Sequence, residues 1–226
     1  MTLQQKKFFI KTQLSTLFFA MTLFASAGTF NYFQGWLYWG TTIVTSFMNY
    51  WTIRNNEALM AERSQVGDNS KQWDKTILGI SALIYLINTV VAGLDAGRFH
   101  WSAPSPLWLS LTGVAVTIFG QTIFLSARSE NSFFSSVMRI QTDRGHTICD
   151  TGLYKSIRHP GYLGMIIALM GTPLITGSMF SWIPTSVAVV LIVLRTDLED
   201  RALQMELEGY KDYQRRTRYR LVKGVW

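Results

Sequence analysis

Long apolar runs alternate with short charged stretches along most of this chain. A helix that crosses a bilayer needs about 20 consecutive apolar residues. The first four runs reach or approach that length, whereas the last two are short. The pattern predicts an all-α fold, a polytopic integral membrane bundle of five to six transmembrane segments. The runs are Leu14–Phe30, Phe33–Ile53, Thr76–Leu94, Ser105–Ala127, Tyr162–Gly177 and Trp182–Leu194.

The last two runs lie close together in the sequence and predict a helical hairpin. Gly177 and Ser178 separate them, and the whole stretch between Arg158 and Arg195 carries no charged residue. Glycine and serine favour a tight turn, because they allow backbone conformations that larger residues resist. We therefore expect the chain to turn near the far headgroup region and to return to the side from which it came.

The basic residues divide unequally between the two sides of the predicted bundle. Of 21 Lys and Arg, 20 fall in the N-terminal tail, in two loops or in the C-terminal tail, and only Arg98 falls on the opposite side. Basic residues concentrate in cytoplasmic loops of membrane proteins. The distribution predicts an integral membrane protein with both termini cytoplasmic. The net charge of +7 then indicates contact with membrane lipids and not with nucleic acid.

Further features of the sequence bear on its domain organisation, on signal-peptide cleavage and on disulfide or metal sites. Residues 1–226 are expected to form a single membrane domain, with four transmembrane helices in 1–127 and a functional core with a C-terminal tail in 128–226. The start of the chain imitates a cleavable signal peptide, because lysines precede an apolar run that ends in Ala25-Ser26-Ala27. The close second apolar run favours a retained hairpin instead.

The single cysteine, Cys149, permits no intrachain disulfide, and the spacing of the histidines supports no metal site. No obligate protein partner is inferred.

Two charged stretches carry the candidate chemistry. Pro160 suits the first turn of a helix, where its missing N–H is not needed, so Arg158 and His159 should directly precede a membrane helix. The N–H groups at such a helix start favour an anionic group. Arg195 and Glu199 are four residues apart and share a helical face. The predicted hairpin brings both stretches together at one pocket on the membrane surface.

Each of these residues also has a simpler interpretation. Arg158 fits an ordinary positive-inside anchor, and tyrosines such as Tyr154 and Tyr162 are common at membrane interfaces. Arg195 and Glu199 would then be a surface ion pair, and His146 a polar loop residue. The functional interpretation depends on the combination of these residues and not on any one of them.

The combination resembles the isoprenylcysteine carboxyl methyltransferase family, including a bacterial branch of it, and the likeness to that branch implies the bacterial inner membrane as the location. The resemblance lies in Arg144-Gly-His146, Gly152-Leu-Tyr154, Arg158-His-Pro-Gly-Tyr162-Leu-Gly164, Arg195-Thr-Asp-Leu-Glu199-Asp200 and Gly209-Tyr-Lys-Asp-Tyr213. Trp73-Asp74 and Asn131-Ser-Phe133-Phe134 also resemble it. The family often has proline where this chain has Leu153 or Lys223, and glutamate where it has Asp200. Neither Leu153 nor Lys223 replaces an expected ligand.

The resemblance implies an enzyme that uses S-adenosyl-L-methionine to methylate a lipophilic acceptor at the cytoplasmic membrane surface, most simply a carboxylate. The implied catalytic residues are Arg195, Glu199 and His146. The residues implied to bind the cofactor are His146, Tyr154, Arg158, His159, Pro160, Tyr162, Gly164 and Glu199.

Two other classes of protein remain open on sequence alone. Sterol or lipid double-bond reductases that use NADPH are similar in their C-terminal region, although they usually have more membrane helices. A non-enzymatic transport or assembly protein is the other, although the four long runs carry no charge in their centres. The identity of the acceptor, and the choice between O-, N- and S-methylation, stay open.

Overall fold

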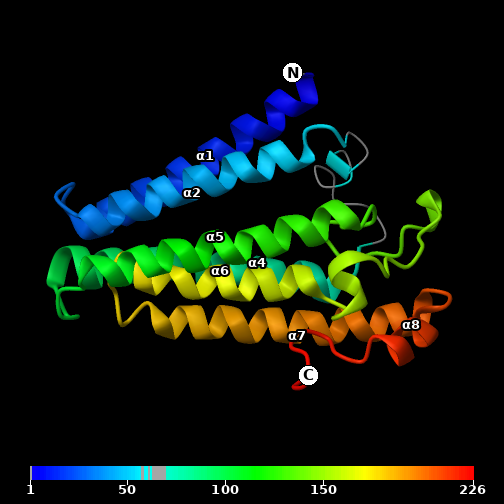
Figure 1. Cartoon of the computed structure of the whole chain (residues 1–226). Helices are drawn as coiled ribbons and strands as arrows, with labels where there is room; N and C mark the ends of the chain where they lie inside the picture. Colours follow the sequence, from blue (N-terminus) through cyan, green and yellow to red (C-terminus); the bar gives the residue numbers. More distant parts are fainter. Residues whose placement is uncertain (1, 57–58, 61, 63–69) are drawn as a thin grey trace.

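The computed structural model describes residues 2–56, 59–60, 62 and 70–226 as a bundle of long helices with a polar cap at one end (Figure 1). No strand occurs in this described part of the chain, which confirms the all-α prediction. Short helical turns occupy Thr142–Arg144 and Gly152–Lys155. The longer elements are α1 Leu3–Ala27, α2 Phe33–Ile53, α4 Gln72–Ala92, the π-helix η1 Gly93–Phe99, α5 Leu107–Glu130, α6 Pro160–Thr176, α7 Trp182–Glu206 and α8 Tyr210–Arg216.

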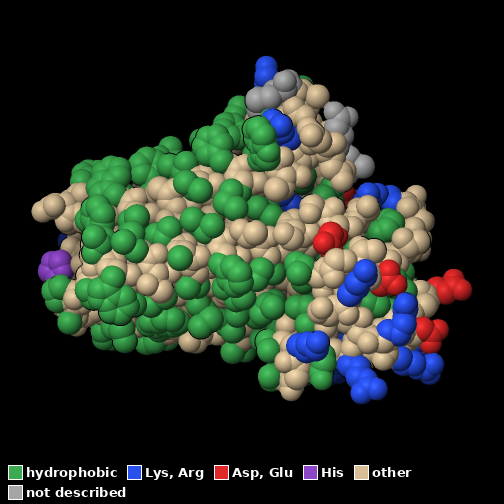
Figure 2. All heavy atoms as spheres, viewed as in Figure 1, with side chains coloured by type: hydrophobic (Ala, Val, Ile, Leu, Met, Phe, Trp, Pro, Cys, Tyr) green, Lys and Arg blue, Asp and Glu red, His purple; other side chains and the backbone are tan. Residues whose placement is uncertain are grey.

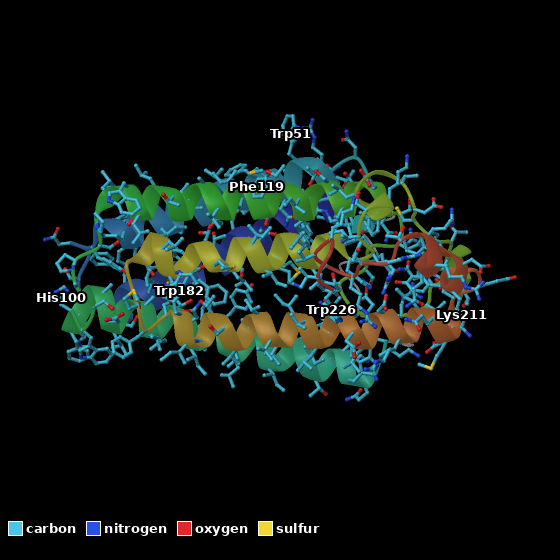
Figure 3. The ribbon with its side chains drawn as sticks, turned by 60° about the horizontal axis from the view of Figure 1, so that its bottom comes forward. Trp51, His100, Phe119, Trp182, Lys211 and Trp226 are labelled. Atoms are coloured by element: carbon cyan, nitrogen blue, oxygen red, sulfur yellow. The ribbon has the colours of Figure 1, made fainter. Side chains whose placement is uncertain are left out.

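The surface of the bundle fits a membrane. Among the described residues, three helical stretches are long and apolar enough to cross one, Leu3–Ala27, Gln72–Phe99 and Leu107–Glu130, and α6 is a shorter apolar helix. Hydrophobic side chains cover the flank, whereas Lys, Arg, Asp and Glu side chains gather at the end that carries α8 (Figure 2). His100 and Lys211 lie at opposite ends (Figure 3). The protein is therefore an integral membrane protein. Arg63, one of the basic residues counted above, lies outside the described residues.

Several helices extend beyond the apolar runs that predicted them. The bounds of α2 agree with the sequence prediction, but α1 begins at Leu3 because Thr2 and Gln5 form a capping box there. Helix α7 continues past Leu194 to Glu206, so its charged second half belongs to the cap. Hydrophobicity marks where a helix meets lipid, whereas caps and tertiary contacts decide where it ends.

The third run does not end at Leu94, because the chain continues as the π-helix η1. This change of helical register buries Asp95 completely. The Asp95 carboxylate accepts hydrogen bonds from the N–H and hydroxyl of Ser102, at 2.8 and 2.7 Å. It also accepts one from the Ser178 hydroxyl at 2.5 Å and one from the Phe180 N–H at 3.2 Å. Asp95 thus fastens α4 to the turn between α6 and α7.

The predicted hairpin between α6 and α7 is confirmed. Gly177 ends α6 with a φ of 70°, and the N–H of Gly177 bonds to the carbonyl of Pro173. A residue with a Cβ is strained at such a φ, so glycine is favoured at this turn. The two helices then run side by side, which returns α7 to the cap (Figure 1).

Helices α5 and α6 approach one another at glycines. A Cβ placed on Gly120 would lie 2.3 Å from the backbone N of Ala168, and one on Gly164 would lie 2.5 Å from the N of Phe124. Small residues permit this close backbone contact between membrane helices. Gly164, which the resemblance implied as a cofactor ligand, therefore lies in the contact between two helices.

Substitution of Gly164 by alanine should destabilise the bundle, because the added methyl group forces α5 and α6 apart. We expect the cost to be about 1–3 kcal/mol, the usual range for overpacking. The melting temperature in detergent measures it.

Gly79→Ala is the matched control. A Cβ at this α4 position meets nothing within 4 Å. Alanine there should be neutral or should stabilise the helix by roughly 0.5–1 kcal/mol. Equal losses of stability in the two variants would contradict the packing interpretation.

Candidate active site

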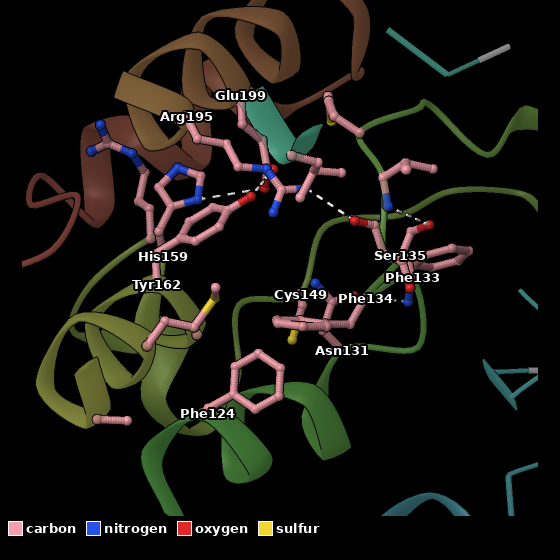
Figure 4. Close-up of a pocket in the computed structure, with 18 of the residues that line it drawn as sticks. Phe124, Asn131, Phe133, Phe134, Ser135, Cys149, His159, Tyr162, Arg195 and Glu199 are labelled. Atoms are coloured by element: carbon pink, nitrogen blue, oxygen red, sulfur yellow. Dashed lines mark hydrogen bonds and ion pairs between the residues drawn. The ribbon is translucent and has the colours of Figure 1, made fainter. Parts of the chain in front are cut away.

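A cavity of about 530 Å³ opens within the charged end of the bundle and continues between the helices. Such a volume lies in the range of about 300–1,000 Å³ that is common for small-molecule sites. At the charged end its wall includes residues of α6, of α7 and of the loop that follows α5 (Figure 4). The cavity-lining residues in that region include Phe134, His146, His159, Tyr162, Arg195 and Glu199.

A buried carboxylate, Asp200 of α7, holds the cap together. It accepts two hydrogen bonds from Arg158, from Nε at 2.8 Å and from Nη2 at 2.9 Å. The His159 Nε2 lies 3.1 Å from the same carboxylate and donates to it. Further donors are Arg220 at 2.9 Å, Tyr210 at 2.8 Å and Gln204 at 3.0 Å. Asp200 therefore joins α6, α7, α8 and the C-terminal tail.

These donors keep Asp200 ionised. Burial alone would raise its pKa, but the hydrogen bonds from His159 and Arg158 outweigh burial and hold the pKa well below its usual range. An ionised carboxylate buried without partners would be very costly, so the cluster is stable only as a whole.

Arg158 has little capacity left for a ligand. Besides its two bonds to Asp200, its Nη1 donates to the carbonyls of Thr217 at 2.8 Å and Arg218 at 2.6 Å. The backbone N–H groups of Arg158 and His159 donate to the carbonyls of Tyr219 and Arg220. Arg158 thus fastens the tail against the start of α6, which the simpler anchor interpretation did not foresee. It borders the cavity mainly as a structural residue.

Glu199 turns toward the cavity from the neighbouring position on α7. It accepts a hydrogen bond of 2.6 Å from the Tyr162 hydroxyl, and its Oε1 lies 3.7 Å from Nδ1 of His159. These contacts confirm that the Arg158-His159-Pro160 turn and the charged part of α7 converge at one cavity. The side chain of Glu199 is 21% exposed, so it can still accept bonds from a ligand.

Arg195 pairs with Asp74 of α4 and not with Glu199. Its Nε and Nη2 donate to the two carboxylate oxygens of Asp74, at 2.6 and 3.1 Å, and Nη2 also donates to the carbonyl of Ser136. The backbone N–H of Met138 donates to Asp74 as well, at 2.6 Å. No contact within the described residues uses Nη1 of Arg195, and Arg195 lines the cavity. The sequence motif gave no sign of this pairing, because Asp74 is far from Arg195 in the chain.

His146 lies against Phe133 in the loop after α5, with 4.5 Å between the ring centroids. Its Nδ1 accepts the backbone N–H of Gln141 at 3.2 Å. Burial and the positive charges of Arg139 and Arg144 lower the pKa of His146 to about 4. His146 is therefore neutral at pH 7, with its proton on Nε2, from which it can donate a hydrogen bond.

Some of the other predicted site residues border the cavity, and others do not. Tyr154 borders the cavity, but its hydroxyl donates to the carbonyl of Ala127 at 3.3 Å, and its own carbonyl accepts from Tyr213 at 2.7 Å. Pro160 begins α6 and is buried, and neither it nor Gly164 is among the cavity-lining residues. Phe124 and Phe134 add an aromatic wall that sequence reasoning did not assign to the site (Figure 4). The described residues contain no group of three metal-ligating side chains.

Comparison with known proteins matches part of this chain to a known family. Residues 113–205 match the model of the isoprenylcysteine carboxyl methyltransferase family, from α5 to the end of α7. The protein-S-isoprenylcysteine O-methyltransferases of Mus musculus and Homo sapiens are 28% and 29% identical over 128 residues. Those matches cover 52% of this chain and 44% and 43% of the relatives.

A rice protein is similar over a shorter stretch. The probable protein-S-isoprenylcysteine O-methyltransferase of Oryza sativa subsp. japonica is 30% identical over 89 residues, which is 39% of this chain and 44% of that protein. The chain thus spans less than half the length of each of these three relatives. The matched region contains both convergent clusters, so this chain resembles the isoprenylcysteine carboxyl methyltransferase family in the part that forms the candidate site.

Proposed function

We propose that this protein transfers a methyl group from S-adenosyl-L-methionine to a lipophilic acceptor, with a carboxylate as the first candidate. One observation carries the proposal: a single cavity joins a charged pocket in the family region to an apolar interior between the helices. A polar methyl donor fits the first part, and a lipid fits the second. The relatives named above methylate isoprenylcysteine according to their names, which agrees with an acceptor of this kind.

The residues at the charged end fit the methyl donor. Glu199 offers a partly exposed carboxylate to ribose hydroxyls or to an amino group. The rings of Tyr162, Phe124 and Phe134 line the same cavity and can attract a cation through their faces. When bound, the donor supplies a methyl group that is activated by a positively charged sulfur.

Arg195 is suited to orient a carboxylate acceptor. Asp74 fixes two of its nitrogens, so the guanidinium is held in place while Nη1 remains for a ligand. A carboxylate is already ionised at neutral pH, so it needs no base. Alignment of the two reactants can contribute roughly 7–11 kcal/mol. Exclusion of water also favours a reaction that neutralises both charges.

The state of His146 weighs against acceptors that must lose a proton. An amine or a phenol would need a base, and the low pKa of His146 and its occupied Nδ1 remove one of the two candidates. His146 can donate a hydrogen bond from Nε2 instead. Glu199 remains as the other candidate base.

The charged end of the bundle is proposed to face the cytoplasm, since it carries nearly all the basic residues. Both termini would then be cytoplasmic, as would the entrance for the donor. The acceptor would enter from the bilayer. Incubation of the purified protein with methyl-labelled donor, an isoprenylcysteine analogue and membrane lipid extract tests the activity directly, through the identity of the labelled product.

Glu199→Gln should weaken donor binding at least tenfold. A hydrogen bond to a charged group is worth about 1.5–3 kcal/mol, and glutamine removes the charge while it keeps the size of the side chain. Calorimetry with S-adenosylhomocysteine measures the affinity. Glu208→Gln changes an exposed carboxylate outside the cavity and is the matched control. Unchanged affinity in Glu199→Gln would remove Glu199 from the donor site.

Asp74→Asn should raise the KM for a carboxylate acceptor by about tenfold or more and leave the affinity for S-adenosylhomocysteine within about twofold, because it releases Arg195 from a charge-assisted pair. Steady-state kinetics and calorimetry separate the two effects. The control is Asp143→Asn, which changes an exposed partner of Arg139. A loss of donor affinity equal to the rise in KM would mean that Arg195 serves the donor or the fold.

His146 should make the protein less stable in mild acid. Its pKa falls from 6.5 to about 4 in the folded state, so between these values the unfolded chain binds a proton that the folded chain does not. His146 therefore does not lower the free energy of unfolding above pH 6.5, but it lowers it progressively as the pH falls from 6.5 toward 4. His146→Asn should flatten this slope in thermal melts between pH 7 and pH 4, with no change above pH 7. An identical slope in both proteins would contradict the neutral, half-buried state of His146.

A further inference from the structure

The cavity has an inner arm that runs deep between the membrane helices. Its lining on α6 extends from Gly161 to Ile175, and at a rise of about 1.5 Å per residue this is roughly 21 Å. The arm is therefore long enough to hold much of a lipid tail. Its wall is not purely apolar, because it includes Tyr38, Thr41, Tyr85, Thr117, Gln121 and Thr172.

Most of the threonines in this wall need no ligand. The hydroxyls of Thr41, Thr42 and Thr45 donate to carbonyls of their own helix, at 2.7, 2.8 and 3.1 Å. Thr117 approaches the carbonyl of Ala168 across the helix contact at 3.4 Å. Hydroxyls that bond in this way are common in membrane helices and do not by themselves indicate a binding site.

Tyr85 and Gln121 differ from these threonines. Both side chains line the cavity, and neither the Tyr85 hydroxyl nor the Gln121 amide makes a hydrogen bond to any residue that the structure describes. Tyr85 lies at the middle of the span Gln72–Phe99, and Gln121 lies in the central part of Leu107–Glu130. A polar group left unpaired in an apolar environment is costly, and lipid offers no partner.

The two side chains supply the same kind of group to the arm. A phenol hydroxyl and a carboxamide both donate hydrogen bonds. Tyr85 packs against the cluster of Leu169, Ala188 and Ile192. Leu169 of α6 lies ten residues after His159 and therefore about 15 Å farther along the helix. The donors thus lie along the expected path of a tail, well away from the charged pocket.

We propose that the inner arm is a subsite for a hydrogen-bond-accepting oxygen, such as a ketone or an ester, in the apolar body of the methyl acceptor. The inference rests on the proposed function, because it takes the acceptor to occupy this cavity. A tail of hydrocarbon alone, such as an isoprenyl chain, leaves both donors without a partner. An oxygenated tail satisfies at least one of them, so this chain should select a lipid class by its tail as well as by its methyl-accepting group.

Two fatty acids that differ by one oxygen provide the test. Stearate and its mid-chain ketone both carry a carboxylate for Arg195, and only the ketone can accept a bond in the inner arm. Calorimetry uses the full chain in detergent, saturated with S-adenosylhomocysteine. The ketone should bind about 3- to 10-fold more tightly, the gain that one added hydrogen bond gives.

Variants assign this gain to the inner arm. Gln121→Leu and Tyr85→Phe should each reduce the preference for the ketone, and their unchanged binding of stearate would show that the fold is intact. Thr122→Val and Tyr50→Phe remove hydroxyls from α5 and α2 outside this cavity, so they should keep the preference. Equal binding of the two fatty acids to the unaltered protein overturns the proposal. So does a preference that survives both cavity variants, or failure of both fatty acids to bind.

The fatty-acid test and the test of the proposed function can fail separately. Absence of S-adenosylhomocysteine binding and of labelled product from any acceptor would refute methyl transfer. The binding ratio of the two fatty acids is measured without turnover. If the donor binds and the protein still favours hydrocarbon chains, only the tail subsite is refuted.

Discussion

The buried charge of Asp200 is the constraint on which the rest of the site depends. Its six hydrogen bonds come from Arg158 and His159 at the start of α6, from Gln204 of α7 itself, from Tyr210 of α8 and from Arg220 of the tail. Removal of one partner from a buried ion cluster leaves an uncompensated charge, which is far more costly than the loss of one exposed pair. The cluster therefore fixes the position of the charged end of α7, and with it the face of the helix from which Glu199 points into the cavity.

The two arginine–aspartate pairs at this end of the bundle leave their arginines in different states. Arg158 has its nitrogens engaged by Asp200 and by two tail carbonyls, so it serves the fold. Arg195 is held by Asp74 through one edge of its guanidinium and keeps the other edge toward the cavity. A rigid arginine with free donors loses little entropy when it binds a carboxylate. The same residue type is therefore structural in one motif, whereas in the other it faces the cavity, where the proposed function assigns it to the acceptor.

Sequence reasoning found the large features of this arrangement and missed the pairings. The apolar runs and the turn at Gly177 predicted the convergence of α6 and α7, because hydrophobicity and backbone conformation are local properties. Helical spacing suggested Arg195 with Glu199, but the partner is Asp74, which only the packing of α4 against α7 brings close. The sequence suggested that Gly164 lets a ligand approach the backbone. In the structure, the absence of a Cβ at Gly164 lets α5 pack closely against α6. Partners distant in the chain cannot be read from spacing.

The position of the cavity relates the chemistry to the membrane. Its charged end holds Glu199 and Arg195 on residues that stable ion pairs and hydrogen bonds position, whereas its inner arm lies among helices that face lipid. A methyl donor that carries charge and an acceptor that dissolves in lipid share no common solvent, so a soluble enzyme would have to extract one of them. A cavity that spans both environments leaves each reactant in its own medium until they meet. In the proposed subsite, polar groups in the apolar part would act chiefly on selectivity, because a donor without a partner disfavours a tail that lacks the matching oxygen.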